Sequence, residues 1–327
     1  MESPASEFAL IERHFSRSPR HADVRLGVGD DAAVVAPTPG MELAITVDML
    51  VEGRHFFAGT DADALGHKSL AVNLSDLAAM GARARYVLLA GALPDSDEAW
   101  IERFMHGFRA LADLHDVELI GGDTTRGPRT VCITAIGEVP PGAALTRSGA
   151  RAGDDVYVSG ALGGAALAVA ALRGNVALDD ATLAHARARL ERPTPRLALG
   201  MALRGVATAA IDVSDGLTGD LGHILERSAC GAVVDLERIP SDAGVAAQLE
   251  GPQRALALRC LLAGGDDYEL CFTAPSDARA RVESAVRSAG VPCARIGHIR
   301  RETGLVVQDA TGRALDALPA AFDHFAS

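Results

Sequence analysis

The feature that most constrains this chain is a series of aspartates beside small residues, most of them at the end of an apolar, strand-like run. A single motif of this kind would be an ordinary turn, because Asp and Gly populate turns. Their repetition beside segments that look buried favours a site where several carboxylates hold divalent cations against a polyanion, with ATP the leading candidate. The motifs are Gly29-Asp30-Asp31, Val47-Asp48, Ser75-Asp76, Gly121-Gly122-Asp123, Asp212-Val213-Ser214-Asp215 and Gly264-Gly265-Asp266-Asp267.

The chain is acidic, with 43 acidic and 31 basic side chains and a formal net charge of −12. Such a charge does not attract nucleic acid or an anionic membrane, but it attracts cations and, through them, phosphates. Residues 1–15 lack the apolar core of a signal peptide, and the longest run of small apolar residues, Ala161–Leu172, is too short to span a bilayer. The five cysteines are scattered without a C-x-x-C pair, which argues against disulfides and structural zinc. We therefore expect a cytoplasmic protein with no nucleic-acid or membrane partner.

Strand-like and helix-like segments alternate in both halves of the chain, which indicates an α/β or α+β class with two domains. We place the domain boundary near Arg147, shortly after the breaker sequence Pro140-Pro141-Gly142, so that the domains are 1–147 and 148–327. The first expected strand, 42–48, is interpreted as buried and as ending at Asp48. The other expected strands are 85–93, 117–120, 130–139, 153–160 with its turn, 207–211, 231–236, 268–273, 293–299 and 305–308. The expected helices are 61–81, 97–115, one from 162, 179–190, 195–204, 217–228 and 276–289.

The predicted helix 61–81 has an apolar stripe on one face and a polar stripe on another, each at helical spacing. The rest of the helix is rich in Ala, Val and Leu, so the polar stripe needs something polar to face. The alternative is a solvated face, but such a face would normally carry Arg or Glu. The apolar stripe is Leu70, Leu74 and Leu77, and the polar stripe is Ser69, Asn73 and Asp76.

Nucleotide binding in this chain would have to proceed without the usual phosphate-binding lysine. The G-x-x-x-x-G-K-[ST] motif is absent, and Lys68, the only lysine, is not in a glycine-rich loop. Magnesium held by carboxylates, assisted by an arginine or by backbone N–H groups, could replace that lysine. Covalent catalysis has less support, because no G-x-S-x-G or H-E-x-x-H motif is present and the cysteines have no context that would lower a thiol pKa. Among the histidines we retain His55, which follows Asp48 in a loop.

The ordered set of motifs closely resembles the thiamine-monophosphate kinase family over essentially the whole chain. The matching segments are Gly27-Val-Gly-Asp-Asp-Ala32, Ala71-Val-Asn-Leu-Ser-Asp-Leu-Ala-Ala-Met-Gly81, Ile120-Gly-Gly-Asp-Thr-Thr-Arg-Gly127, Ala144-Leu-Thr-Arg-Ser-Gly149, Ile211-Asp-Val-Ser-Asp-Gly216, Gly264-Gly-Asp-Asp-Tyr-Glu-Leu270 and Phe322-Asp-His-Phe325.

The resemblance implies the two-domain fold of aminoimidazole ribonucleotide synthetase, with an N-terminal α+β domain, whose strands pair with a second subunit, and a C-terminal α/β domain. It implies a homodimer that transfers a phosphate from ATP to thiamine monophosphate, giving ADP and thiamine diphosphate. Several magnesium ions would be bound by Asp31, Thr46, Val47 through its backbone, Asp48, Asp76, Asp123, Asp212 and Asp215. ATP would be contacted by Gly122, Asp123, Arg147 and Ser214, and the thiamine substrate by His55, Asp266 and Phe322.

Two positions depart from the family pattern: Asp266 stands where Glu is common, and Phe322 stands where another aromatic residue is. Both changes keep the chemistry and could alter the fit of the thiamine substrate. The alternatives are another ATP-dependent enzyme of the same superfamily, a metal-dependent phosphohydrolase that uses the same carboxylates to activate water, or a non-catalytic acidic binding module. The absence of a reactive N-terminal Cys and of a C-terminal Cys argues against the selenophosphate synthetase and hydrogenase-maturation relatives.

Overall fold

A computed structural model describes residues 10–320 of the chain. The chain divides into two compact units, of which unit 1 comprises Met1–Leu77 and Ala82–Gly142 and unit 2 comprises Ala78–Gly81 and Ala143–Ser327. The division in the chain falls at the Pro140-Pro141-Gly142 sequence. No helix in the described part of the chain is both long enough and apolar enough to cross a membrane.

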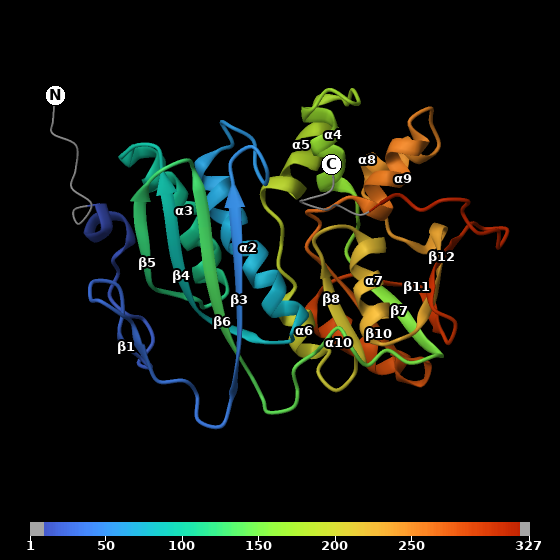
Figure 1. Ribbon diagram of the computed structural model, residues 1–327, viewed down its shortest axis with the longest axis horizontal. Coiled ribbons are helices and arrows are strands. Elements are labelled where there is room, and N and C mark those ends of the chain that lie inside the picture. The colour runs from blue at the N-terminus through green and yellow to red at the C-terminus, as the bar shows by residue number, and fades with distance from the viewer. Residues whose placement is uncertain (1–9, 321–327) are drawn as a thin grey trace. The chain divides into compact units, whose positions relative to one another are not determined.

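Unit 1 is a four-stranded sheet in the order β3-β6-β4-β5, with helices α2 and α3 on one face (Figure 1). Neighbouring strands are antiparallel except for the parallel pair β4–β5. The leucine stripe predicted for α2 is at most 1% exposed, which confirms that this face belongs to the core. The main elements are β3 (Glu42–Val51), α2 (Ala62–Ala79), β4 (Arg83–Leu93), α3 (Glu98–Leu114), β5 (Glu118–Arg126) and β6 (Thr130–Val139). They are preceded by a short π-helix (Ile11–Phe15) and by β1 (Val24–Leu26) and β2 (Val34–Val35).

The two helices of unit 1 approach each other closely because each has a glycine at the crossing. A Cβ atom added to Gly66 of α2 would lie 1.9 Å from the carbonyl oxygen of Phe104. A Cβ atom added to Gly107 of α3 would lie 1.8 Å from the carbonyl oxygen of Asp63. Neither position accepts a side chain unless the helices separate, so this crossing depends on the two glycines.

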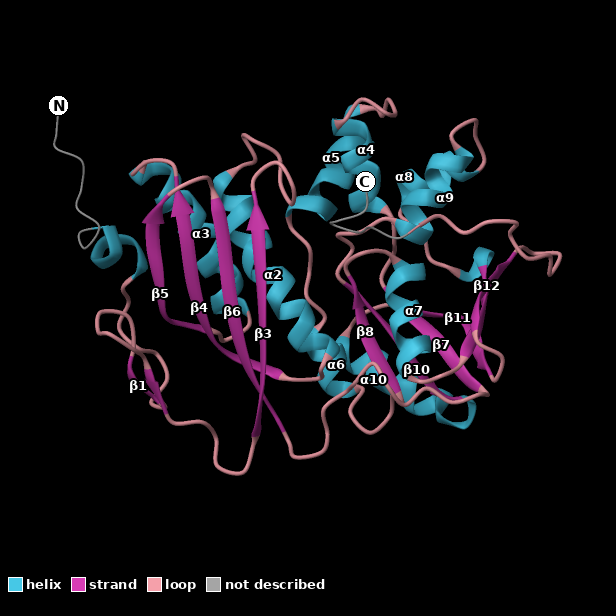
Figure 2. Cartoon of the chain, in the orientation of Figure 1, coloured by secondary structure: helices cyan, strands magenta, loops and turns pink. Residues whose placement is uncertain are grey.

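Unit 2 is a six-stranded sheet in the order β12-β9-β11-β7-β10-β8, packed against helices (Figure 2). All of its strand pairs are antiparallel except β12–β9. The strands are β7 (Asp154–Ser159), β8 (Ala209–Val213), β9 (Gly231–Asp235), β10 (Glu269–Pro275), β11 (Cys293–Arg300) and β12 (Gly304–Gln308). The helices are α4 (Gly164–Leu172), α5 (Asp180–Glu191), α6 (Leu197–Ala202), α7 (Leu217–Arg227), α8 (Ala243–Leu249), α9 (Arg254–Ala263) and α10 (Arg279–Ala289), with 3-10 turns at Leu236–Arg238 and Ser276–Ala278.

The structure corrects the interpretation of 42–48 as a buried strand that ends at Asp48. β3 continues to Val51 because it pairs with β6 along its whole length, and it is an edge strand of the sheet. The face of β3 turned away from α2 is exposed because no other element of the described chain covers it. Its apolar side chains are Leu43, Ile45, Val47 and Met49, with exposed fractions of 45%, 63%, 60% and 55%.

Three of the supposed acidic turns are parts of strands. β5 continues through Gly121, Gly122 and Asp123 to Arg126, because this segment pairs in parallel with β4. Asp48 lies within β3, and Asp212 lies within β8. A strand position directs a side chain to one face of the sheet, so these acids project from sheet faces.

Candidate active site: two acidic strand edges and two joined turns

The first group of predicted ligands lies where α2 packs against β3. The Thr46 hydroxyl donates a hydrogen bond to the Asp76 carboxylate, and the Asp48 backbone N–H donates to Asn73 Oδ1 at 3.1 Å. Asn73 is fully buried and Ser69 is 1% exposed, so the polar stripe of α2 is not a solvated face. Asp76 and Asn73 of this stripe bond to β3, so these two have the polar partners that the sequence pattern requires. Ser69 instead donates to the Gly66 carbonyl oxygen of its own helix at 3.0 Å. The amide of Asn73, to which the sequence analysis gave no ligand role, connects the helix to the strand that carries Asp48.

His55 lies in the loop after β3 and is held by hydrogen bonds to β3 and to α2. Its Nδ1 accepts a 3.0 Å hydrogen bond from the Val51 backbone N–H. The neutral ring therefore carries its proton on Nε2. The buried Lys68 donates from Nζ to the His55 carbonyl oxygen at 3.3 Å. The single lysine of the chain thus supports the loop that carries His55.

Gly122 and Asp123 lie on the opposite edge of the same sheet. The strand register aligns Asp48 with Ile133, Leu89 and Gly122 across β3, β6, β4 and β5. Three strand spacings separate the two edges by about 14 Å. Glycine is required at 122, because a Cβ atom there would lie 1.8 Å from the Leu89 carbonyl oxygen. Unit 1 therefore does not bring Asp48 and Asp123 together within one chain.

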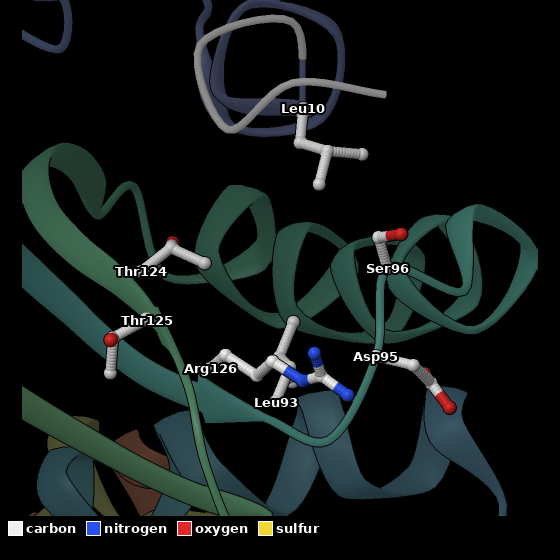
Figure 3. A pocket seen from close by; sticks show the side chains of 7 residues that line it. All are labelled: Leu10, Leu93, Asp95, Ser96, Thr124, Thr125 and Arg126. Carbon is white, nitrogen blue, oxygen red and sulfur yellow. The ribbon is translucent and has the colours of Figure 1, made fainter. Parts of the chain in front are cut away.

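A pocket of about 410 Å³ opens beyond Asp123, at the ends of β4 and β5 (Figure 3). Figure 3 shows the Arg126 side chain among hydroxyl groups of β5 and of the loop that precedes α3. Arg126 donates from Nε to the Pro94 carbonyl oxygen at 3.2 Å, and this hydrogen bond restrains its guanidinium group. The lining residues are Leu10, Leu93, Asp95, Ser96, Thr124, Thr125 and Arg126.

The turn at Ser214 and Asp215, which follows β8 of unit 2, is shaped by a buried acid that the sequence analysis did not identify. Asp220, in the first turn of α7, accepts 3.1 Å hydrogen bonds from the backbone N–H groups of Ser214 and Asp215. Asp220 is 3% exposed, and burial raises its pKa to about 7. Its position shortly after the Ser-Asp-Gly sequence, at the start of a helix, is a signal that could have identified it.

The second acidic turn of unit 2 is joined directly to the first. The Asp266 N–H donates to the Ser214 carbonyl oxygen at 2.9 Å, and the Tyr268 N–H donates to that of Val213 at 2.8 Å. Gly265 allows this approach, since a Cβ atom there would lie 2.5 Å from the Ser214 carbonyl oxygen. The structure therefore brings together Asp212, Ser214, Asp215 and Asp266.

Three other predicted residues remain, of which two are exposed and one lies outside the described residues. Asp31 is exposed in the segment between β1 and β2. Its backbone N–H donates a hydrogen bond to the carboxylate of Asp30. Arg147 is exposed in the segment before β7, where its carbonyl oxygen accepts a 3.5 Å hydrogen bond from the Ser228 hydroxyl. Phe322 lies outside the described residues.

The donor groups at these positions fit magnesium in their chemistry. They are carboxylate, hydroxyl and carbonyl oxygens, the hard ligands that Mg²⁺ prefers, and each group supplies only a few of them, which leaves coordination positions for water or phosphate. Within the described residues of either unit, no three His, Cys, Asp or Glu side chains form a ready-made metal cage. A thiol nucleophile has no support, because burial raises the pKa of all five cysteines.

Comparisons with known proteins agree with this architecture. Residues 29–139 match the AIR synthase related protein N-terminal domain, and residues 151–310 match the corresponding C-terminal domain. The chain is 45% identical over 325 residues to a thiamine-monophosphate kinase of Escherichia coli K12, covering 98% of both chains. It is 43% identical to that of Salmonella typhimurium, again covering 98% of both chains.

Solved structures give the same result. A thiamine-monophosphate kinase from Stenotrophomonas maltophilia K279a superposes with a TM-score of 0.86 at 48% identity, covering 95% of this chain and 98% of the other. AaThiL complexed with AMPPCP and TMP superposes with a TM-score of 0.76 at 28% identity, covering 91% and 92% of the two chains. A hydrogenase maturation protein, HypE, at 23% identity shares the fold alone. The chain belongs to the thiamine-monophosphate kinase family.

Proposed function

We propose that this protein transfers the γ-phosphate of ATP directly to the phosphate of thiamine monophosphate, giving ADP and thiamine diphosphate, in the cytoplasm. The observation that carries the proposal is the joining of the two acidic turns of unit 2. It holds Asp266, assigned to the thiamine substrate, beside Asp212, Ser214 and Asp215, assigned to metal and ATP. A phosphoryl transfer needs donor and acceptor positioned together, which this arrangement supports.

Magnesium supplies neutralisation of the phosphate charges when it is bound. The proposed ligands are Asp31, Thr46, the Val47 backbone, Asp48, Asp76, Asp123, Asp212 and Asp215. The chain's own groups then position the two substrates. Gly122, Asp123 and Ser214 contact ATP, and Arg147 offsets charge on its phosphates. The pocket beyond Asp123 has a volume suited to a small molecule and gives the rest of the nucleotide a place to bind. The acceptor phosphate is largely ionised near neutral pH, so no strong general base is required.

The thiamine substrate carries a cationic ring, an amine and a phosphate, and the three proposed contacts suit these groups. Asp266 attracts the positive charge or accepts a hydrogen bond from the amine. Phe322 offers an aromatic face to the pyrimidine or thiazolium ring. His55, with its proton on Nε2, is a donor for a phosphate oxygen.

We propose that the active form is a homodimer with ligands contributed across its interface. Asp48 and Asp123 lie on opposite edges of one sheet, so one chain does not place both on the same ATP. A second copy whose β5 lies along β3 of the first would bring the two strand edges that carry these acids side by side. The exposed apolar face of β3 supports association with a second copy, because monomeric proteins seldom leave such a patch in water. The dimer would have twice the 33.8 kDa mass of the chain in sedimentation.

The first test is a product assay with protein, ATP, magnesium and thiamine monophosphate, in which thiamine diphosphate and ADP are separated by chromatography. We expect equimolar formation of the two products and complete loss of both when a chelator removes magnesium. ADP and free phosphate without thiamine diphosphate would overturn the proposal and indicate a metal-dependent phosphohydrolase.

A further inference from the structure

The segment that carries Asp266 has an unusual backbone. Asp266 and Tyr268 have φ angles of +69° and +51°, and they are two of the four non-glycine residues with positive φ in the described chain. For a bulky residue such as tyrosine this conformation is a genuine outlier. Left-handed residues of this kind persist only where the surroundings determine them, and they concentrate at functional sites.

The surroundings of this segment do determine its conformation. Between the two residues, Asp267 is 3% exposed, and both of its carboxylate oxygens accept hydrogen bonds from the Gly163 N–H, at 3.0 and 2.8 Å. Directly after Tyr268, Glu269 is 1% exposed and accepts hydrogen bonds from Arg189, Arg196 and the Ser159 hydroxyl. Buried anchors thus alternate with Asp266 and Tyr268.

The consequence of this backbone is a contact between two side chains two residues apart. The Tyr268 hydroxyl donates a hydrogen bond to Asp266 Oδ1 at 3.1 Å. Tyr268 is 9% exposed, and its ring has only two side-chain torsions, so the hydroxyl is a fixed point. Asp266 is half-buried at the surface of the joined turns. The hydroxyl therefore defines the direction in which the Asp266 carboxylate faces.

We propose that Tyr268 is a positioning residue that orients the Asp266 carboxylate for the thiamine substrate, which carries a cationic thiazolium ring and an amine on its pyrimidine ring. The inference rests on the proposed function, in which Asp266 contacts that substrate. A carboxylate fixed before binding loses less freedom when the ligand arrives, which increases affinity. ATP does not depend on this carboxylate, so Tyr268 acts on the use of one substrate and not the other.

The test is Tyr268→Phe, which keeps the packed ring and removes only the hydroxyl. We expect the KM for thiamine monophosphate to rise about five- to tenfold, as for the loss of an ordinary intramolecular hydrogen bond. The KM for ATP and kcat should stay within about twofold, because no ATP contact is lost. The matched control is Tyr157→Phe, since the Tyr157 hydroxyl also donates to an aspartate two residues before it, Asp155, at 3.3 Å. That variant should leave both KM values unchanged.

A second variant approaches the same hydrogen bond from the other side. Asp266→Asn should raise the KM for thiamine monophosphate, and adding Tyr268→Phe to it should raise that KM little further, because the two residues act as a unit. An effect of Asp266→Asn without an effect of Tyr268→Phe would overturn the inference and leave the proposed function intact. An equal rise of both KM values in Tyr268→Phe would also overturn it. Failure of the wild-type protein to form thiamine diphosphate would instead reject the proposed function.

Discussion

Asp155 of β7 is a residue whose charge is used for stability and not for the reaction. It is 2% exposed and accepts hydrogen bonds from Arg279 at 2.6 and 3.0 Å and from Arg295 at 3.1 Å. Burial acts to raise its pKa, but the bonds from Arg279 and Arg295 prevail, and the pKa is lowered. The ionised form of Asp155 is therefore favoured in the folded protein.

The sign of the pH dependence follows from that lowered pKa. The stabilisation is fully present above the unfolded-state pKa of about 3.9 and is lost as pH falls through the folded-state value. Asp155→Asn should lower the free energy of unfolding by about 1 to 3 kcal/mol at neutral pH, measured by urea denaturation. The difference from wild type should shrink below about pH 4. Glu283→Gln, which removes an exposed partner of Arg287, should have little effect at either pH. A difference that persists undiminished in acid would contradict the charge assignment.

At the scale of elements, the crossing of α2 and α3 depends on backbone contact. Gly66→Ala should destabilise unit 1 by about 1 to 3 kcal/mol or more, because the added methyl group meets the backbone at Phe104, which cannot rotate away. The control is Gly222→Ala in α7, where an added Cβ meets nothing within 4 Å. That variant should be neutral or gain up to about 1 kcal/mol. Urea unfolding midpoints measure both, and equal effects of the two variants would refute the crossing as the cause.

The same scale shows what the sequence could predict. The existence of the main strands and helices follows from apolar periodicity, and Asp97 and Asp179 cap α3 and α5 with side-chain hydrogen bonds, as their position before each helix suggests. The extent of β3 and β5 does not follow, because strand pairing carries both through an aspartate that local propensity assigns to a turn. Helices α8 and α9 were not predicted. Apolar residues lie around much of α9, which leaves little helical periodicity to detect.

At the scale of the whole molecule, the sequence motifs identify the candidate carboxylates but do not predict which of them lie close together in space. Asp212 and Asp215 meet Asp266 because β8 and β10 are neighbours in the sheet of unit 2, which no local pattern reveals. Asp48 and Asp123 are separated for the same kind of reason, since β3 and β5 are the two edge strands of unit 1. Because the chain has a net charge of −12, it would repel ATP unless cations accompany the nucleotide.

The separation of Asp48 and Asp123 on opposite sheet edges has a genetic consequence. If the two acids serve one site from different chains, Asp48→Asn and Asp123→Asn are each inactive alone but complement each other when co-expressed. A mixed dimer holds one site with both lesions and one with neither, so random assortment restores about a quarter of wild-type turnover. Turnover in the purified mixture, measured against each parent variant, checks this. If the mixture is as inactive as its parents although mass measurement shows that mixed dimers are present, the two acids do not serve one site from different chains.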